Sequence, residues 1–353
     1  MKRSIPLLTT LIAAVVLAAC STQPSSAPQH TKRVHPTMRL VAYAPSTPTA
    51  PVSAAASIRL AFSDSLAKTS PLPIVTPSTS GSWERLSPAS ITFVPTASLI
   101  PDTTYTVSVP PTLRSGASTI TNPVVFSFHT APISNLRIQE MLAQLDYLPL
   151  NFNQQDTSQP SSPADLAGDF SWKWNIPESI TSNWSPGQSN VIEKGAIMRF
   201  QEVNHLVVDG VPGPQFTSAL LAALRSNTHD PDPYNYVLVN KSLPQSLTLY
   251  SNGAPIFTAK VNTGIPGQDT ASGTYPVYLR YAVTTMSGTN PDGSHYHDEG
   301  IPWTSYFNGG DALHGFIRPG YGWPQSLGCV EMSFADAGSV WPHTPLGTLV
   351  NVS

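Results

Sequence analysis

The chain has 353 residues, of which 40% are hydrophobic and only 11% charged, and its net charge at pH 7 is −3. This length suffices for two or three domains. No basic run follows Lys2 and Arg3, so the sequence lacks the electrostatic surface of a nucleic-acid-binding protein, and no nucleic acid is expected as a partner. The 36 prolines, with many serines and threonines, favour a β-rich chain with long turns over a coiled coil.

Residues 1–20 have the pattern of a targeting segment. A positive start is followed by an apolar stretch, residues 7–16, that is too short for a membrane span. The run Leu-Ala-Ala-Cys at residues 17–20 then resembles a bacterial lipobox, which implies that Cys20 becomes the lipidated first residue of an exported protein anchored to the cell membrane and facing the cell wall. An ordinary signal peptide with a chance cysteine is the alternative.

Residues 21–37 are rich in Ser, Pro, Gln and Thr, and we expect a flexible tether there. Residues 38–131 alternate apolar and polar positions in short runs separated by turn residues, which predicts a small antiparallel sandwich. Residues 81–83, 91–95 and 99–107 of this region resemble bacterial immunoglobulin-like modules. That resemblance implies a spacer, and no catalytic grouping occurs within it.

Residues 134–228 change to helical spacing, seen at 136–145 and again at 216–224. The pair Asp209-Gly210 indicates a tight turn, because glycine tolerates positive φ and aspartate can bond to the backbone that follows. The pattern resembles the three-helix peptidoglycan-binding domain, which implies binding to the cell wall. Residues 149–190 are longer than that pattern expects. Three tryptophans in this insertion would either stack on sugars or, as we favour, pack locally: Trp172, Trp174 and Trp184.

Residues 232–353 predict a mostly β domain. Strand patterns recur up to the C-terminus, Asn252-Gly253 is typical of a type I′ turn, and a helix is expected only around 334–340. The expected fold is therefore mainly β and multidomain. It comprises an immunoglobulin-like sandwich, a small helical domain and a mostly β C-terminal domain.

The last domain carries a candidate nucleophile, Cys329, one of only two cysteines in the chain. If Cys20 is lipidated, Cys329 has no intramolecular partner, which is unusual in an exported protein. A thiol needs to lose its proton to become a good nucleophile, and His314 upstream would take that proton. Gly315 would let a carbonyl approach the imidazole, and Gly328 would let backbone N–H groups face an oxyanion. A buried structural cysteine is the weaker alternative.

His-Gly followed by Ser-x-Gly-Cys in a β domain resembles the YkuD-type L,D-transpeptidase catalytic domain, whose members cross-link peptidoglycan stem peptides through a cysteine thioester. The resemblance implies the following roles: Cys329 as nucleophile, His314 as general base, Gly315 as the base-orienting position, and Ser326 and Gly328 as parts of the catalytic loop. It further implies that stem peptides and glycan are the partners, that carbapenem-type inhibitors bind, and that neither a cofactor nor a metal is needed.

Two positions depart from the family pattern. Leu327 stands where a second histidine is usual, so that imidazole is absent. Glu331 stands where Arg or Asn is usual, and its carboxylate would repel a substrate carboxylate or would need a nearby cation such as Arg318. Neither change removes the cysteine–histidine pair, but both bear on which substrate is preferred.

Residues 288–303 are expected to form a rim or lid over a cleft. The candidate substrate-binding residues are Tyr296, Trp303, Tyr321, Trp323, Arg318 and Glu331, with Tyr306 as a further aromatic; core or rim packing is the equal alternative for the aromatic side chains. The run His-Tyr-His-Asp-Glu at 295–299 offers no recognisable third ligand, so we expect no metal there.

The function expected from these patterns is an L,D-transpeptidase that transfers a stem peptide from its cysteine to an amine. An L,D-carboxypeptidase would use the same residues with water as the acceptor. A wall-binding lipoprotein without catalysis is the other alternative. A papain-type protease is disfavoured, because the histidine precedes the cysteine and no long helix follows it.

Overall fold

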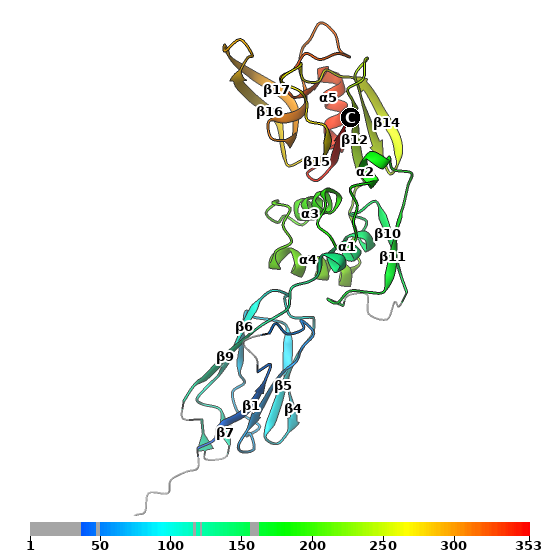
Figure 1. The fold of residues 1–353 in the computed structure, drawn as a ribbon. Helices are drawn as coiled ribbons and strands as arrows, with labels where there is room; N and C mark the ends of the chain where they lie inside the picture. The colour runs from blue at the N-terminus through cyan, green and yellow to red at the C-terminus, as the bar shows by residue number, and fades with distance from the viewer. Residues whose placement is uncertain (1–36, 47–49, 116–117, 121, 156–161) are drawn as a thin grey trace, which may run out of the picture. The chain divides into compact units, whose positions relative to one another are not determined.

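The computed structural model describes residues 37–353, except 47–49, 116–117, 121 and 156–161 (Figure 1). The predicted targeting segment, the predicted lipidation site Cys20 and nearly all of the expected tether lie outside the described residues. Within them, no helix is both long and apolar enough to cross a membrane. The fold is mainly β, as predicted.

The first described region is a β-sandwich. One sheet has the strand order β1-β2-β5-β4 and the other β3-β6-β9, beside a short hairpin β7–β8. The strands are β1 Leu40–Ala44, β2 Ile58–Phe62, β3 Ile74–Thr76, β4 Gly81–Ser87, β5 Ser90–Pro95, β6 Thr104–Val109, β7 Arg114–Ser115, β8 Ser118–Thr119 and β9 Val124–His129. Alternate side chains on these strands, such as Ile58 and Leu60, are buried in one core, as the period-2 pattern predicts.

The second region contains three main helices and a hairpin. Its elements are α1 Asn135–Gln144, β10 Leu150–Gln154, β11 Gly168–Trp172, α2 Glu178–Thr181, α3 Val191–Val203 and α4 Pro214–Ser226. Ser134 caps α1 and Asn190 caps α3, each by accepting backbone N–H bonds. The expected turn follows α3, where Gln201 Oε1 accepts the backbone N–H groups of Asp209 and Gly210.

The insertion between α1 and α3 supplies the hairpin β10–β11, and its tryptophans pack against other side chains. Trp172 and Trp184 meet edge to face, while Trp174 stacks on Tyr234 at 6.3 Å between ring centroids. All three tryptophans are half-buried against the core of the helical region, in agreement with the packing interpretation.

The third region is built from two sheets and one helix. Five strands have the order β14-β13-β12-β20-β15 and four have the order β16-β17-β18-β19. The elements are β12 Asn235–Asn240, β13 Ser246–Ser251, β14 Ala254–Lys260, β15 Gly273–Pro276, β16 Leu279–Thr289, β17 His295–Asn308, β18 Asp311–Gly315, β19 Val330–Met332, α5 Phe334–Val340, a 3-10 turn Trp341–His343 and β20 Leu349–Val352. Positive φ at Asn252 and Gly253 agrees with the expected turn.

The expected rim over residues 288–303 is a strand hairpin rather than a loop. Strands β16 and β17 pair in register from Leu279 with Tyr306 to Thr289 with His295, so only residues 290–294 form a turn. The sequence did not show this hairpin because most of its residues beyond the sheet core are exposed or half-buried, so no hydrophobic alternation marks the strands.

Candidate active site

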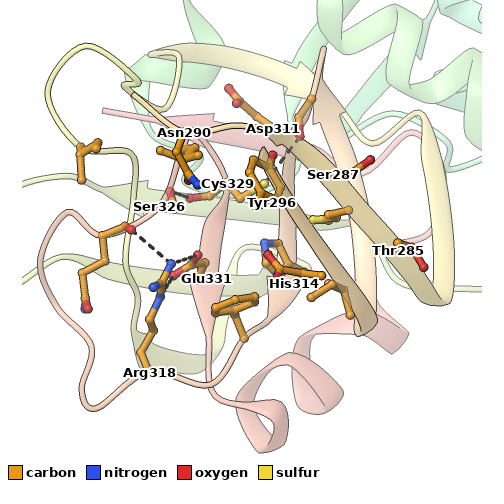
Figure 2. Close-up of a pocket in the computed structure, with 18 of the residues that line it drawn as sticks. Thr285, Ser287, Asn290, Tyr296, Asp311, His314, Arg318, Ser326, Cys329 and Glu331 are labelled. Atoms are coloured by element: carbon orange, nitrogen blue, oxygen red, sulfur yellow. Dashed lines mark hydrogen bonds and ion pairs between the residues drawn. The ribbon is translucent and has the colours of Figure 1, made fainter. Parts of the chain in front are cut away.

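The two candidate catalytic residues are carried by neighbouring strands. Strands β18 and β19 run parallel, with Leu313 opposite Val330 and His314 opposite Glu331. Cys329 immediately precedes β19, so this register places it beside the start of β18. Both Cys329 and His314 line a pocket of about 890 Å³ whose other wall includes the β16–β17 hairpin (Figure 2). The topology thus brings the histidine and the cysteine to one cavity, as the motif predicts.

The thiol of Cys329 is held in its protonated form. Packing around the sulfur raises the pKa of the thiol to about 12, and the carboxylates of Asp311 and Glu331 add to the increase. The Sγ atom donates a hydrogen bond to the carbonyl oxygen of Gly310 at 3.6 Å. At neutral pH the resting nucleophile is therefore a thiol, and it needs a base during the reaction itself.

His314 is the imidazole that lines the same pocket as Cys329, and it is only 2% exposed. Its Nδ1 lies 3.0 Å from the carbonyl oxygen of Gly315, so the neutral ring carries its proton on Nδ1 and leaves Nε2 as the acceptor. Burial lowers the pKa of His314 below its usual range. At neutral pH the imidazole of His314 is thus neutral and able to accept a proton, while the thiol of Cys329 is still protonated.

The two glycines of the motif meet steric requirements. A Cβ on Gly315 would lie 2.9 Å from the ring of Phe334, so a larger residue would displace the helix α5 from the strand of the base. Gly328 has φ of +122° and a Cβ there would lie 2.4 Å from Asp311 Oδ1. Only glycine fits that conformation and that space.

Ser326 fixes the loop that presents the thiol. It is buried, its Oγ donates to the carbonyl oxygen of Cys329, and it accepts the N–H of Gly328 at 3.2 Å. The amide of Gly328, which we expected at an oxyanion, is therefore engaged within the loop. Leu327 lines the pocket with an apolar side chain in place of the usual imidazole.

Glu331 has the cation that its position requires. Arg318 donates from Nε and Nη2 to the two carboxylate oxygens of Glu331 at 2.8 and 2.7 Å, and Nη2 also donates to the Gln325 carbonyl (Figure 2). The guanidinium lies over the Phe316 ring at 4.6 Å. This bidentate ion pair links the loop before Cys329 to β19, and the positive charge of Arg318 compensates the negative charge of Glu331.

The structure separates the predicted substrate-binding residues into two groups. Tyr296, Arg318 and Glu331 line the pocket, as does Tyr306. Three residues are not on its wall, and their role in substrate binding stays a prediction: Trp303, Tyr321 and Trp323.

Each of these three side chains has another contact. Trp303 packs on Trp341 at 5.4 Å, because it projects toward α5 and the 3-10 turn that follows it. The Tyr321 hydroxyl donates to the Phe316 carbonyl and holds the loop in place. Trp323 packs against Gly320 within the same loop.

One pocket residue, Asp311, was not indicated by any motif. It begins β18, three residues before His314, and becomes a neighbour of the nucleophile only through the pairing of β18 with β19. Among the described residues, no group of three or more His, Cys, Asp or Glu side chains is arranged to hold a metal ion. His297 and Glu299 instead form an exposed pair at 3.3 Å.

Comparison with known families identifies two of the three regions. Residues 234–352 match the model of the YkuD L,D-transpeptidase catalytic domain, and residues 35–130 match that of a bacterial Ig-like domain. These matches confirm both resemblances and show that the pocket belongs to an L,D-transpeptidase catalytic domain. The resemblance of residues 134–228 to a peptidoglycan-binding domain stays a prediction.

Solved structures with which the chain aligns include three L,D-transpeptidases. The one from Mycobacterium smegmatis is 12% identical, with 90% of this chain and 100% of that chain covered and a TM-score of 0.31. L,D-transpeptidase 3 from Mycobacterium tuberculosis, solved with a faropenem-derived adduct, is 13% identical over 89% and 97% of the chains with a TM-score of 0.32. The E. faecium catalytic domain is 22% identical over 35% and 99%, with a TM-score of 0.31. No curated protein matches the chain.

Proposed function

We propose that this protein cross-links peptidoglycan by L,D-transpeptidation, with Cys329 as the nucleophile and His314 as the general base. The observation that carries the proposal is the buried, carbonyl-oriented His314 in the same pocket as a protonated Cys329, within a domain that matches the L,D-transpeptidase model. The donor would be a stem peptide with a terminal D-residue, and the acceptor an amine of a second stem.

In the first step the sulfur of Cys329 attacks the carbonyl carbon before the terminal D-residue while the thiol proton passes to Nε2 of His314. The amide C–N bond then breaks, and His314 returns the proton to the nitrogen of the departing D-residue. A thioester on Cys329 remains, and His314 is neutral again.

In the second step an acceptor amine attacks the thioester carbon, the C–S bond breaks, and the nitrogen loses a proton through His314 to the sulfur. A new amide is formed and the thiol is regenerated. Water at the same position would instead give a trimmed acid, which is the L,D-carboxypeptidase alternative.

The placement of the protein is a further proposal. The lipobox-like run at residues 17–20 supports export and a lipid anchor on Cys20, on the outer side of the cell membrane. The helical pattern of residues 134–228 supports binding to the glycan or peptide of the wall. Labelling of cells with a radioactive fatty acid, with Cys20→Ala as control, tests the anchor, because only the unsubstituted protein should carry the label.

The experiment that tests the catalytic proposal is the intact mass of the purified protein after exposure to a carbapenem. We expect a drug-sized adduct on the wild type, none on Cys329→Ala, and acylation slowed by at least a hundredfold in His314→Ala. Incubation with a disaccharide-tetrapeptide should then give cross-linked dimers. An accessible, reduced Cys329 that gains no adduct would favour the wall-binding alternative, and tripeptides without dimers would favour the carboxypeptidase.

A further inference from the structure

Three acidic residues line the pocket, Asp298, Asp311 and Glu331, and the reaction described above uses none of them; Asp311 is the one that lies against the loop of the nucleophile. It lies in the first position of β18, directly after the Gly310 carbonyl that accepts the thiol hydrogen bond. Its Oδ1 is so close to the Cα of Gly328 that no side chain would fit between them. One carboxylate oxygen is thus in contact with the residue that precedes the nucleophile.

The strand register places Cys329 between Asp311 and the general base. Since Leu313 is opposite Val330, Cys329 is next to Ala312, which lies one position after Asp311 and two positions before His314 along β18. Figure 2 shows the same order, with Cys329 between Asp311 and His314. The acyl group on the sulfur would therefore have a proton acceptor on one side and a carboxyl group on the other.

The carboxylate is held in place without being neutralised by a cation. The backbone N–H of Ala271 donates to Oδ2 at 3.3 Å, and the Asn308 side chain is a second hydrogen-bond partner. Glu331, the other acidic residue nearest the sulfur, is paired with Arg318. Asp311 is therefore the carboxylate beside the nucleophile whose hydrogen-bond partners within the described residues are uncharged.

We propose that Asp311 binds the amine of the incoming acceptor and thereby favours transfer to an amine over hydrolysis. This inference rests on the proposed function. An acceptor ammonium is attracted to the carboxylate, and after the loss of one proton to solvent the neutral amine still donates an N–H bond to it. Its lone pair can then face the thioester. Water gains much less from a carboxylate, since it has no charge.

The bonds exchanged remain those of the second step: N–C forms, C–S breaks, and the proton goes through His314 to the sulfur. Asp311 takes up no proton in this sequence; it acts as a binding residue for the acceptor.

The test is the variant Asp311→Asn, which keeps an oxygen for Ala271 and removes the charge. The purified protein is incubated with a disaccharide-tetrapeptide that serves as both donor and acceptor, and dimers and tripeptides are quantified. Acylation by a carbapenem is measured separately, because that step uses no acceptor. Asp292→Asn is the matched control, since it deletes one carboxylate from the exposed hairpin turn and the amide retains the bond to the Ser294 N–H.

We expect the ratio of dimer to tripeptide to fall about tenfold in Asp311→Asn, with carbapenem acylation that is undiminished. Asp292→Asn should keep the wild-type ratio. An unchanged ratio in Asp311→Asn would overturn the inference, and so would a parallel loss of acylation and transfer, which a purely structural role would cause. A wild type that is acylated but never forms dimers would overturn the proposed transpeptidation itself.

Discussion

The helical region and the catalytic domain each bury an arginine–glutamate pair, and the two pairs behave differently. In α1, Arg137 Nη1 and Glu140 Oε2 are 2.9 Å apart and their side chains are 0% and 1% exposed. In the pocket, Arg318 Nη2 and Glu331 Oε1 are 2.7 Å apart, with side chains 29% and 5% exposed. The chemistry is the same, but the contact of the two pairs with solvent is not.

The extent of burial decides whether loss of solvent or hydrogen bonding sets the direction of each pKa shift. Around Arg137 and Glu140 the loss of solvent dominates, lowering the pKa of the arginine and raising that of the glutamate. For Arg318 the hydrogen bonds that it donates to Glu331 dominate and raise its pKa. The first pair links α1 to the Ser162 carbonyl and the Leu166 N–H, whereas the second keeps one partner open to the substrate pocket. A buried ion pair is therefore a structural link in one region and part of a site in the other.

The largest effect is expected from Arg137→Ala. Removal of the guanidinium leaves the buried Glu140 without its ion-pair partner, so that it is either an unpaired charge or has to take up a proton. We therefore expect the free energy of unfolding of the helical region to fall by about 3–5 kcal/mol. Urea unfolding followed by tryptophan fluorescence measures it. The double variant Arg137→Met/Glu140→Leu should recover most of the loss. A loss below 1 kcal/mol in the single variant would mean that the pair is hydrated in solution.

Glu193 in α3 is a buried glutamate that, within the described residues, has no paired arginine of the kind compared above, and burial raises its pKa to about 7. The native state then holds a proton that the unfolded state releases above its ordinary pKa near 4.5. Stability is therefore lost as pH rises through this window, by up to about 3 kcal/mol. Urea unfolding at pH 5 and pH 8 should show this loss in the wild type and little of it in Glu193→Gln. The same slope in both proteins would contradict the assignment.

The variant Arg318→Ala tests the Arg318–Glu331 pair of the pocket, whose arginine is partly exposed to solvent. The cost in unfolding free energy should be smaller than for Arg137, about 1–2 kcal/mol, because water in the pocket can hydrate Glu331. Loss of the cation also leaves Glu331 as an unbalanced charge beside the base, and this raises the pKa of His314. The acid limb of carbapenem acylation should therefore move to higher pH, and Arg318→Ala/Glu331→Ala should move it back. An acid limb that stays in place would show that the pair does not act on His314.

The smallest expected effect concerns the acylation rate of the wild type, which we expect to be independent of pH above neutrality. If the thiol proton passes to His314 during attack, the acylation rate of the wild type should be constant between pH 7 and pH 9. It should decline only at acidic pH, where His314 becomes protonated, because burial lowers the pKa of this imidazole below its usual range. A stopped-flow series with a carbapenem measures this profile. A rate that rises about tenfold per pH unit above pH 7 would instead mean that the thiolate forms before attack.

Much of this architecture can be predicted from local patterns. Alternation over residues 58–62 and helical spacing over 136–145 gave the sandwich and the first helix, because both patterns reflect burial on one side. The motif around His314 and Cys329 indicated a candidate nucleophile and a candidate base for a chemical reason that does not depend on the fold. Arg318 was expected as a cation for Glu331 from charge alone.

What local patterns missed depends on the register of the strands. Trp303 was expected on the pocket wall, but which face of β17 a residue occupies is set by its pairing with β16 and β18. Asp311 reaches the nucleophile through the parallel pairing of β18 and β19, between segments joined by a long loop. No spacing in the sequence reports such a contact.

The protonated state of the Cys329 thiol, which donates a hydrogen bond to the Gly310 carbonyl, bears on how the protein withstands oxidants. Peroxides and disulfides react with thiolates far faster than with thiols. A cysteine whose pKa is raised to about 12 is almost wholly protonated at neutral pH and would react slowly with such agents. In the proposed mechanism, His314 removes the proton when an acyl donor is bound in the pocket, and a diffusing oxidant does not receive this assistance. The resting site would thus be protected against sulfenylation and mixed disulfides without a partner cysteine.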